Sequence, residues 1–165
     1  MEEEKEETPW MDWLQKNKGW HEIAGKEANP FIIDCFNYTS LNGDKLALSD
    51  ETAWCAALAC AALEKNNYKS PHSAAALAFD NYGTPTTLKY GAILTFKRTG
   101  GSGRHVTFFV KEENGYLRCI GGNQRDSLRE SLYPKNEVVA IRWPIKKTSF
   151  LDSKSQNFLR KKEVK

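Results

Sequence analysis

The chain has 165 residues, of which 40% are hydrophobic and 27% are charged, and it contains five Trp, eight Phe and six Tyr. This length and aromatic content predict one domain with a hydrophobic core and exclude disorder over the whole chain. No apolar run approaches the roughly 20 residues of a membrane-spanning helix, so we expect no membrane insertion. The net charge of +3 is too small to indicate nucleic-acid binding, and we expect none.

Charge is concentrated at the two ends of the chain. Residues 1–7 carry a net charge of −4, and residues 146–165 carry +5. We therefore expect an acidic tail at 1–8, one domain at 9–145 and a basic tail at 146–165. Solvated tails usually bind nothing specific, although the basic tail also suits a polyanion such as a cell-wall polymer. The acidic start lacks a secretory pattern, so we expect synthesis in the cytoplasm without Sec export.

Helical patterns occupy the first half of the chain. Apolar residues at helical spacing predict a short helix from 8 to 19, and Pro30 is suited to the first position of a second helix. Residues 39–50 are polar and turn-rich and indicate a loop. The run 53–63 is apolar on all sides, so this helix must be buried on most of its surface. A further helix is predicted from 72 to 82.

After Gly83 the period of the sequence changes from helical to alternating. The alternation predicts strands at 92–97, 105–110, 116–120 and 137–142, and Asn114-Gly115 predicts a tight hairpin turn. A chain in which helices precede an antiparallel sheet is typical of the α+β class.

The four cysteines, Cys35, Cys55, Cys60 and Cys119, include no CxxC pair and no pair at the spacing of zinc ligands. We expect no metal and no cofactor. Their low density also argues against a disulfide framework. The sequence therefore predicts four unpaired thiols, most of them buried.

Cys55 is the candidate nucleophile because the pattern places it in the first turn of the central helix. Free backbone N–H groups and the positive end of the helix dipole lower a thiol pKa there, and the thiolate is the reactive form. The alternative is a small, buried and inert cysteine, as most helix cysteines are. Cys60 lies about 140° further round the helix and is interpreted as a packing residue.

His105 is the candidate base because it begins a strand directly after a glycine-rich loop, where an imidazole stays accessible. An ordinary strand-end histidine is the alternative, and His21 and His72 are the competitors. The segment Gly121-Gly122-Asn123-Gln124 ends the next strand. Asn123 is therefore the candidate for a side-chain oxygen that orients the His105 ring.

Five segments of the chain occur in one order that resembles a known family. They resemble the NlpC-type and CHAP-type papain-like cysteine peptidases that cut bacterial peptidoglycan, and the resemblance covers about residues 10–145. The segments are Trp54-Cys55-Ala56-Ala57, Gly91-Ala92-Ile93-Leu94-Thr95-Phe96, His105-Val106-Thr107-Phe108-Phe109-Val110, Gly121-Gly122-Asn123-Gln124 and Ile141-Arg142-Trp143-Pro144.

This resemblance implies a papain-like NlpC fold, in which N-terminal helices pack on an antiparallel sheet and the nucleophile begins the central helix. It implies that Cys55 is the nucleophile, that its backbone N–H helps to hold the oxyanion, that His105 is the base and that Asn123 orients the base. Trp54, Arg104 and Gln124 become candidates for substrate contact. Arg104 departs from the family, which usually has glycine before the histidine.

The activity that the resemblance implies is amide hydrolysis in a peptidoglycan stem peptide or cross-link, by an endopeptidase or amidase that acts as a monomer. Such enzymes serve as type VI secretion amidase effectors, which meet a cognate immunity protein as inhibitor, or as phage endolysins. The site of action would be the periplasm or cell wall, reached by delivery or lysis. Two alternatives stay open: a non-catalytic wall-binding or interaction module, and a papain-like thiol hydrolase with a non-wall substrate.

Overall fold

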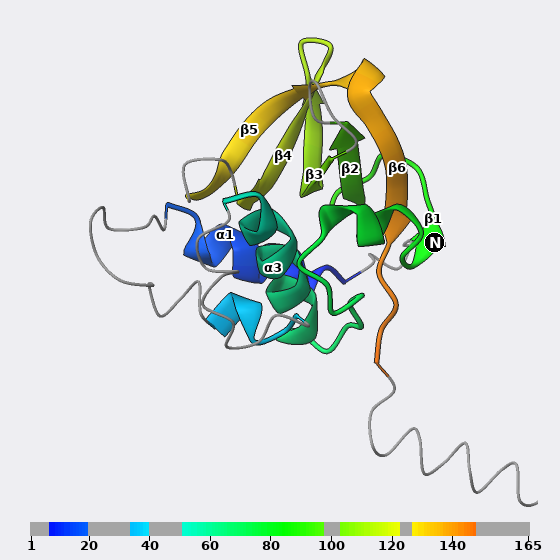
Figure 1. Cartoon of the computed structure of the whole chain (residues 1–165). Helices are drawn as coiled ribbons and strands as arrows, with labels where there is room; N and C mark the ends of the chain where they lie inside the picture. Colours follow the sequence, from blue (N-terminus) through cyan, green and yellow to red (C-terminus); the bar gives the residue numbers. More distant parts are fainter. Residues whose placement is uncertain (1–6, 20–33, 40–50, 98–102, 123–126, 148–165) are drawn as a thin grey trace, which may run out of the picture.

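The computed structural model describes residues 7–19, 34–39, 51–97, 103–122 and 127–147, and it has the α+β architecture (Figure 1). Among these residues, six strands form one antiparallel sheet in the order β1-β6-β2-β3-β4-β5. In chain order the elements are α1 (Pro9–Asn17), α3 (Glu51–Glu64), the 3-10 helix η2 (Ala76–Asp80), β1 (Thr84–Pro85), β2 (Ile93–Lys97), β3 (Arg104–Glu113), β4 (Tyr116–Gly122), β5 (Leu128–Pro134), the 3-10 helix η3 (Lys135–Glu137) and β6 (Val138–Trp143).

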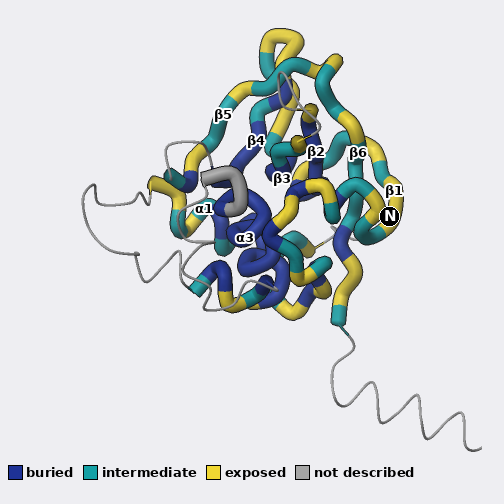
Figure 2. Tube along the Cα trace, viewed as in Figure 1, coloured by how far each residue is buried: buried dark blue, intermediate teal, exposed yellow. Residues whose placement is uncertain are grey.

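The central helix is α3, and its side chains from Trp54 to Leu63 are all buried (Figure 2). Five of these ten residues are alanine, so neighbouring elements can approach the helix axis closely. The helix packs against α1, η2, β3 and β4, and α1 and α3 lie against the same side of the sheet (Figure 1). The prediction that this helix is buried on most sides is confirmed.

Two hydrophobic clusters cover the two faces of the sheet. The helix-side cluster lies between the helices and the sheet and includes Val106 and Phe108 of β3. The far-side cluster includes Phe109 of β3 together with Phe96 and Cys119. Successive residues of a strand point to opposite faces, which explains why neighbouring residues of β3 belong to different clusters.

The sheet curls around its far-side cluster. The ring of Tyr133 on β5 stacks on Phe96 of β2, with 4.9 Å between the ring centroids. In a flat sheet these strands would lie about 14 Å apart, because two further strands separate them. Register shifts at Thr95/Phe96 and at Phe109/Lys111 supply the local bending that such curvature needs.

Most predicted elements are present with slightly different bounds. The hairpin turn at Asn114-Gly115 is confirmed, with both residues at positive φ. The helix predicted from 72 to 82 is wrong, because only the short η2 forms there and His72 has a φ of 50°. Strand β5 was not predicted. The predicted start of the helix at Pro30 lies outside the described residues.

The first residues of the predicted basic tail are attached to the domain. Lys146 forms a β-bridge with Tyr68, and the Lys147 N–H donates to the Asn67 carbonyl at 2.9 Å. The Lys147 ammonium also pairs with the Glu64 carboxylate at the end of α3. Lys146 and Lys147, the first two residues of the predicted basic tail, therefore contact the domain.

Candidate active site

Cys55 lies near the N-terminal end of α3, but not in its first turn. The helix begins at Glu51, so Cys55 is its fifth residue. A helix start leaves only its first four N–H groups without helical partners, and the dipole effect fades beyond the first turn. The expected first-turn position is therefore wrong by one residue, and the geometry gives no support to an oxyanion contact from the Cys55 N–H. The side chain of Cys55 is 4% exposed.

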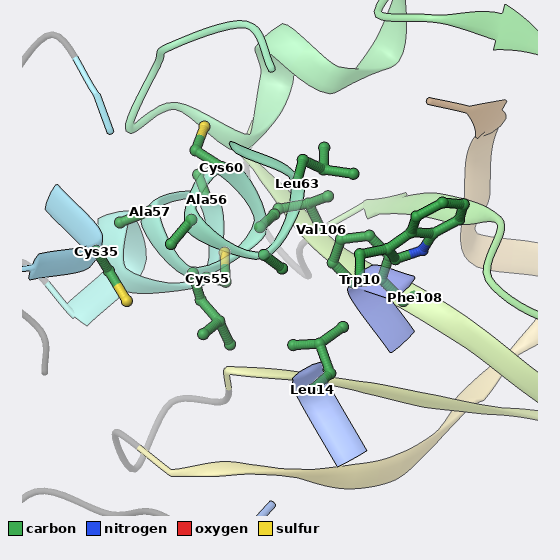
Figure 3. Packing of buried hydrophobic residues seen from close by; sticks show 14 of the residues in the cluster. Trp10, Leu14, Cys35, Cys55, Ala56, Ala57, Cys60, Leu63, Val106 and Phe108 are labelled. Atoms are coloured by element: carbon green, nitrogen blue, oxygen red, sulfur yellow. The ribbon is translucent and has the colours of Figure 1, made fainter. Parts of the chain in front are cut away.

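None of the four cysteines forms a disulfide, and all four are buried. Burial raises the pKa of Cys119 to about 12, and it also raises the pKa of Cys35 and Cys60. The Cys60 thiol donates a hydrogen bond to the Ser73 carbonyl at 3.5 Å, and its sulfur points away from that of Cys55 (Figure 3). These three thiols fit packing roles, as expected for Cys60.

His105 is the second residue of β3, and its ring lies against Tyr133 of β5. The His105 Nε2 and the Tyr133 hydroxyl are 2.9 Å apart, and the two rings stack with 5.3 Å between centroids. Tyr133 packs against the far-side cluster, whereas the next residue of β3, Val106, packs against the helices. The His105 ring therefore belongs to the face of the sheet opposite α3.

Tyr133 interacts with both candidate catalytic residues. Burial raises the pKa of Tyr133 to about 12, and nearby Cys119 and Cys55 raise this pKa further when ionised, while a hydrogen bond with Ser131 lowers it. The structure thus connects Tyr133 to His105 by a hydrogen bond and to Cys55 by electrostatic proximity. A direct contact between Cys55 and His105 stays a prediction.

The two predicted residues that follow β4, Asn123 and Gln124, lie outside the described residues. The strand itself ends at Gly122, directly beside the indole of Trp54. Trp54 is only 2% exposed, so its side chain offers almost no surface to a substrate in this structure.

Arg104, the third candidate for substrate contact, is held by an ion pair. Its Nε donates to the Asp80 carboxylate of η2 at 3.0 Å, and both side chains are largely buried. This pair ties the start of β3 to η2. A contact with a substrate carboxylate would have to share or replace Asp80.

The competing histidines lie elsewhere. His72 bonds the buried carboxylate of Glu64 through Nε2 at 3.0 Å, and its Nδ1 lies 3.2 Å from the Tyr38 carbonyl oxygen. These contacts give His72 a structural role at the C-terminal end of α3. Cys55 lies near the opposite end of this helix. His21 lies outside the described residues.

The described part of the chain holds no group of three or more His, Cys, Asp or Glu side chains arranged to bind a metal ion. No helix in the described ranges is long and apolar enough to cross a membrane. Comparisons of the chain with models of protein families, with curated proteins and with solved structures find no match.

Sequence reasoning missed Tyr133. Its strand reads Leu128-Arg129-Glu130-Ser131-Leu132-Tyr133-Pro134, in which polar residues interrupt the apolar alternation. The contact with His105 also depends on sheet curvature, which no local pattern encodes. Because this strand itself was not predicted, no specific signal in the sequence pointed to Tyr133.

Proposed function

We propose that the chain is a cysteine hydrolase with a papain-like NlpC fold that cleaves an amide bond in the stem peptide or cross-link of peptidoglycan. Two kinds of evidence support this proposal. Five motifs resemble that family in their order along the chain. The α+β architecture also packs the helix that carries Cys55 against the strand on which His105 lies.

The observation that carries the proposal is that Tyr133 interacts with both candidate residues, with one by a hydrogen bond and with the other through its charge. Its hydroxyl hydrogen-bonds His105, and its pKa responds to the charge of Cys55. The three residues come from α3, β3 and β5 and are separated by many residues in the chain. His105 and Tyr133 contact each other on the face of the sheet opposite α3, so the proposal requires that Cys55 reach the imidazole from the helix side. A thiol with an imidazole partner is suited to nucleophilic catalysis.

In the proposed reaction, His105 takes the proton of the Cys55 thiol, and the thiolate attacks the carbonyl carbon of the amide. The C–N bond then breaks, and the His105 imidazolium gives its proton to the leaving amine. A water molecule, deprotonated by His105, attacks the resulting thioester. The products are a carboxylic acid and the regenerated thiol.

The near-complete burial of Cys55 favours the alternative of a non-catalytic wall-binding or interaction module. Iodoacetamide at neutral pH distinguishes the two, because it reacts with thiolates. The proposal predicts prompt alkylation of Cys55, and slow reaction of Cys35, Cys60 and Cys119, whose pKa values burial raises. Equal, slow alkylation of all four thiols would favour the module.

The cell compartment in which the chain is toxic tests the substrate class. Three inducible forms are compared by growth and cell shape in a Gram-negative host: cytosolic, fused to a periplasmic signal, and periplasmic with Cys55→Ala. The proposal predicts lysis only for the periplasmic wild-type form. Equal killing from the cytosol would point to the alternative of a thiol hydrolase with a non-wall substrate. A cognate immunity protein would suppress the periplasmic lysis.

A further inference from the structure

We propose that Tyr133 is a positioning residue of the base, because among the described residues it holds the His105 imidazole by hydrogen bonding and ring stacking. This role rests on the proposed hydrolase function, and it is a role that the sequence assigned to Asn123. The His105 Nε2 and the Tyr133 hydroxyl oxygen lie 2.9 Å apart. The rings stack with 5.3 Å between centroids and 30° between planes.

Tyr133 is itself held in place, which a positioning residue requires. Its other ring contact is Phe96 of β2, at 4.9 Å between centroids and 24° between planes. Phe96 is also the residue opposite His105 in the β2–β3 register. Two neighbouring residues of the sheet, Phe96 and His105, therefore contact one tyrosine ring that reaches them from the distant strand β5. Rotation of the imidazole would break the hydrogen bond and disturb this stack.

The hydrogen bond determines which ring nitrogen of His105 is free to accept the thiol proton. The Tyr133 phenol is neutral at neutral pH, and burial raises its pKa further, to about 12. The proposed role requires that the Tyr133 oxygen accept the Nε2–H of His105, which leaves Nδ1 as the atom that takes the thiol proton. The same contact stabilises the imidazolium that forms during the reaction.

Removing only the hydroxyl tests this role, because Tyr133→Phe keeps the ring stack. We expect kcat on a stem-peptide substrate to fall by roughly tenfold to a hundredfold, with KM little changed. The matched control is Tyr82→Phe. Tyr82 is another tyrosine whose burial raises its pKa to about 12, and it accepts the Ile145 N–H at 3.2 Å, away from His105.

A spectroscopic readout independent of activity accompanies the kinetics. Long-range ¹⁵N–¹H spectra of the folded protein report the tautomer and the pKa of each histidine, and His105→Gln assigns the His105 signals. In the wild type we expect the Nε2–H tautomer at His105. In Tyr133→Phe we expect a mixed tautomer and a lower His105 pKa, because the acceptor that favours imidazolium is lost. The charges of Cys119, Cys55 and Arg129 act on the Tyr133 hydroxyl that makes this hydrogen bond.

Each outcome bears on one of the two proposals. An active wild type whose Tyr133→Phe variant keeps its kcat, or keeps the tautomer and titration of His105, overturns the positioning role alone. A folded wild type without hydrolase activity overturns the proposed function, and the catalytic role of Tyr133 falls with it. Loss of kcat together with the changed His105 signals, but not in Tyr82→Phe, supports the positioning role.

Discussion

Gly122, the last residue of β4, lies so close to Trp54 of α3 that a Cβ atom on the glycine would be 2.8 Å from the indole Nε1. Real Cβ atoms do not approach other atoms so closely, so Gly122→Ala must displace the indole or the strand. Trp54 is the chain neighbour of Cys55. We expect Gly122→Ala to destabilise the fold by about 1–3 kcal/mol, measured by urea unfolding.

A second substitution shows whether this loss comes from the Trp54 contact. Trp54→Phe removes the Nε1 atom, so the double variant Gly122→Ala/Trp54→Phe should lose less stability than the two single losses added together. Additive losses would mean that the alanine is disfavoured by the backbone of β4 rather than by the indole. Gly115→Ala cannot serve as a control, because Gly115 has a φ of +84°, where any side chain strains the backbone.

His105→Ala should reduce activity by about a thousandfold or more, because the base acts in both chemical steps. Asn123→Ala should cost roughly tenfold to a hundredfold, since an orienting group only biases the ring. Initial rates on a defined stem peptide measure both losses. His72→Ala is the control, because His72 bonds Glu64 rather than Tyr133. A loss for His72→Ala as large as that for His105→Ala would show that the base is assigned to the wrong histidine.

The fold should lose stability in alkaline solution. Burial raises the pKa of Tyr82 and Tyr133 from 10.0 to about 12, and that of Cys119 from 9.0 to about 12. The unfolded chain therefore releases protons that the folded protein still holds, so this stability is complete below about pH 9 and is lost as the pH rises toward 12. Urea unfolding at about pH 8 and about pH 11 measures the fall. Equal free energies of unfolding at both values would contradict the burial of these groups.

The carboxylate of Glu64 should contribute more to stability than a surface carboxylate. Its side chain is 2% exposed and interacts with Ser70, His72 and Lys147. We expect Glu64→Gln to cost about 1–2 kcal/mol, because a buried charge-assisted network is broken. The matched control is Glu113→Gln, which breaks the more exposed pair with Arg118 and should cost less. Urea unfolding that ranks the two variants the other way would contradict this assignment.

Elements with a strong local pattern could be predicted from the sequence. The all-apolar run that forms α3 and the Asn114-Gly115 turn carry their own structural signals. The helix predicted at 72–82 fails because serine side chains compete for the backbone there. The Ser70 hydroxyl accepts the His72 N–H, and the Ser73 hydroxyl accepts the Ala75 N–H, so a regular helix does not start.

The candidate site was only partly predictable for a related reason. The sequence singles out Cys55 and His105 by their places on a helix and a strand, which are local properties. The contact between His105 and Tyr133 depends on how far the sheet curls across several strands. That curvature results from bulges and from the packing of the far-side cluster, neither of which appears as a period in the sequence.

Digestion of purified sacculi tests the central claim most directly. Wild-type protein and Cys55→Ala are incubated with sacculi, and the released fragments are identified by mass spectrometry, with circular dichroism to show that both proteins are folded. The removed side chain is small, so Cys55→Ala should cost only about 1 kcal/mol of stability. The account predicts new amide-cleavage products from the wild type and none from folded Cys55→Ala. The same products from both proteins, or none from the folded wild type, would contradict it.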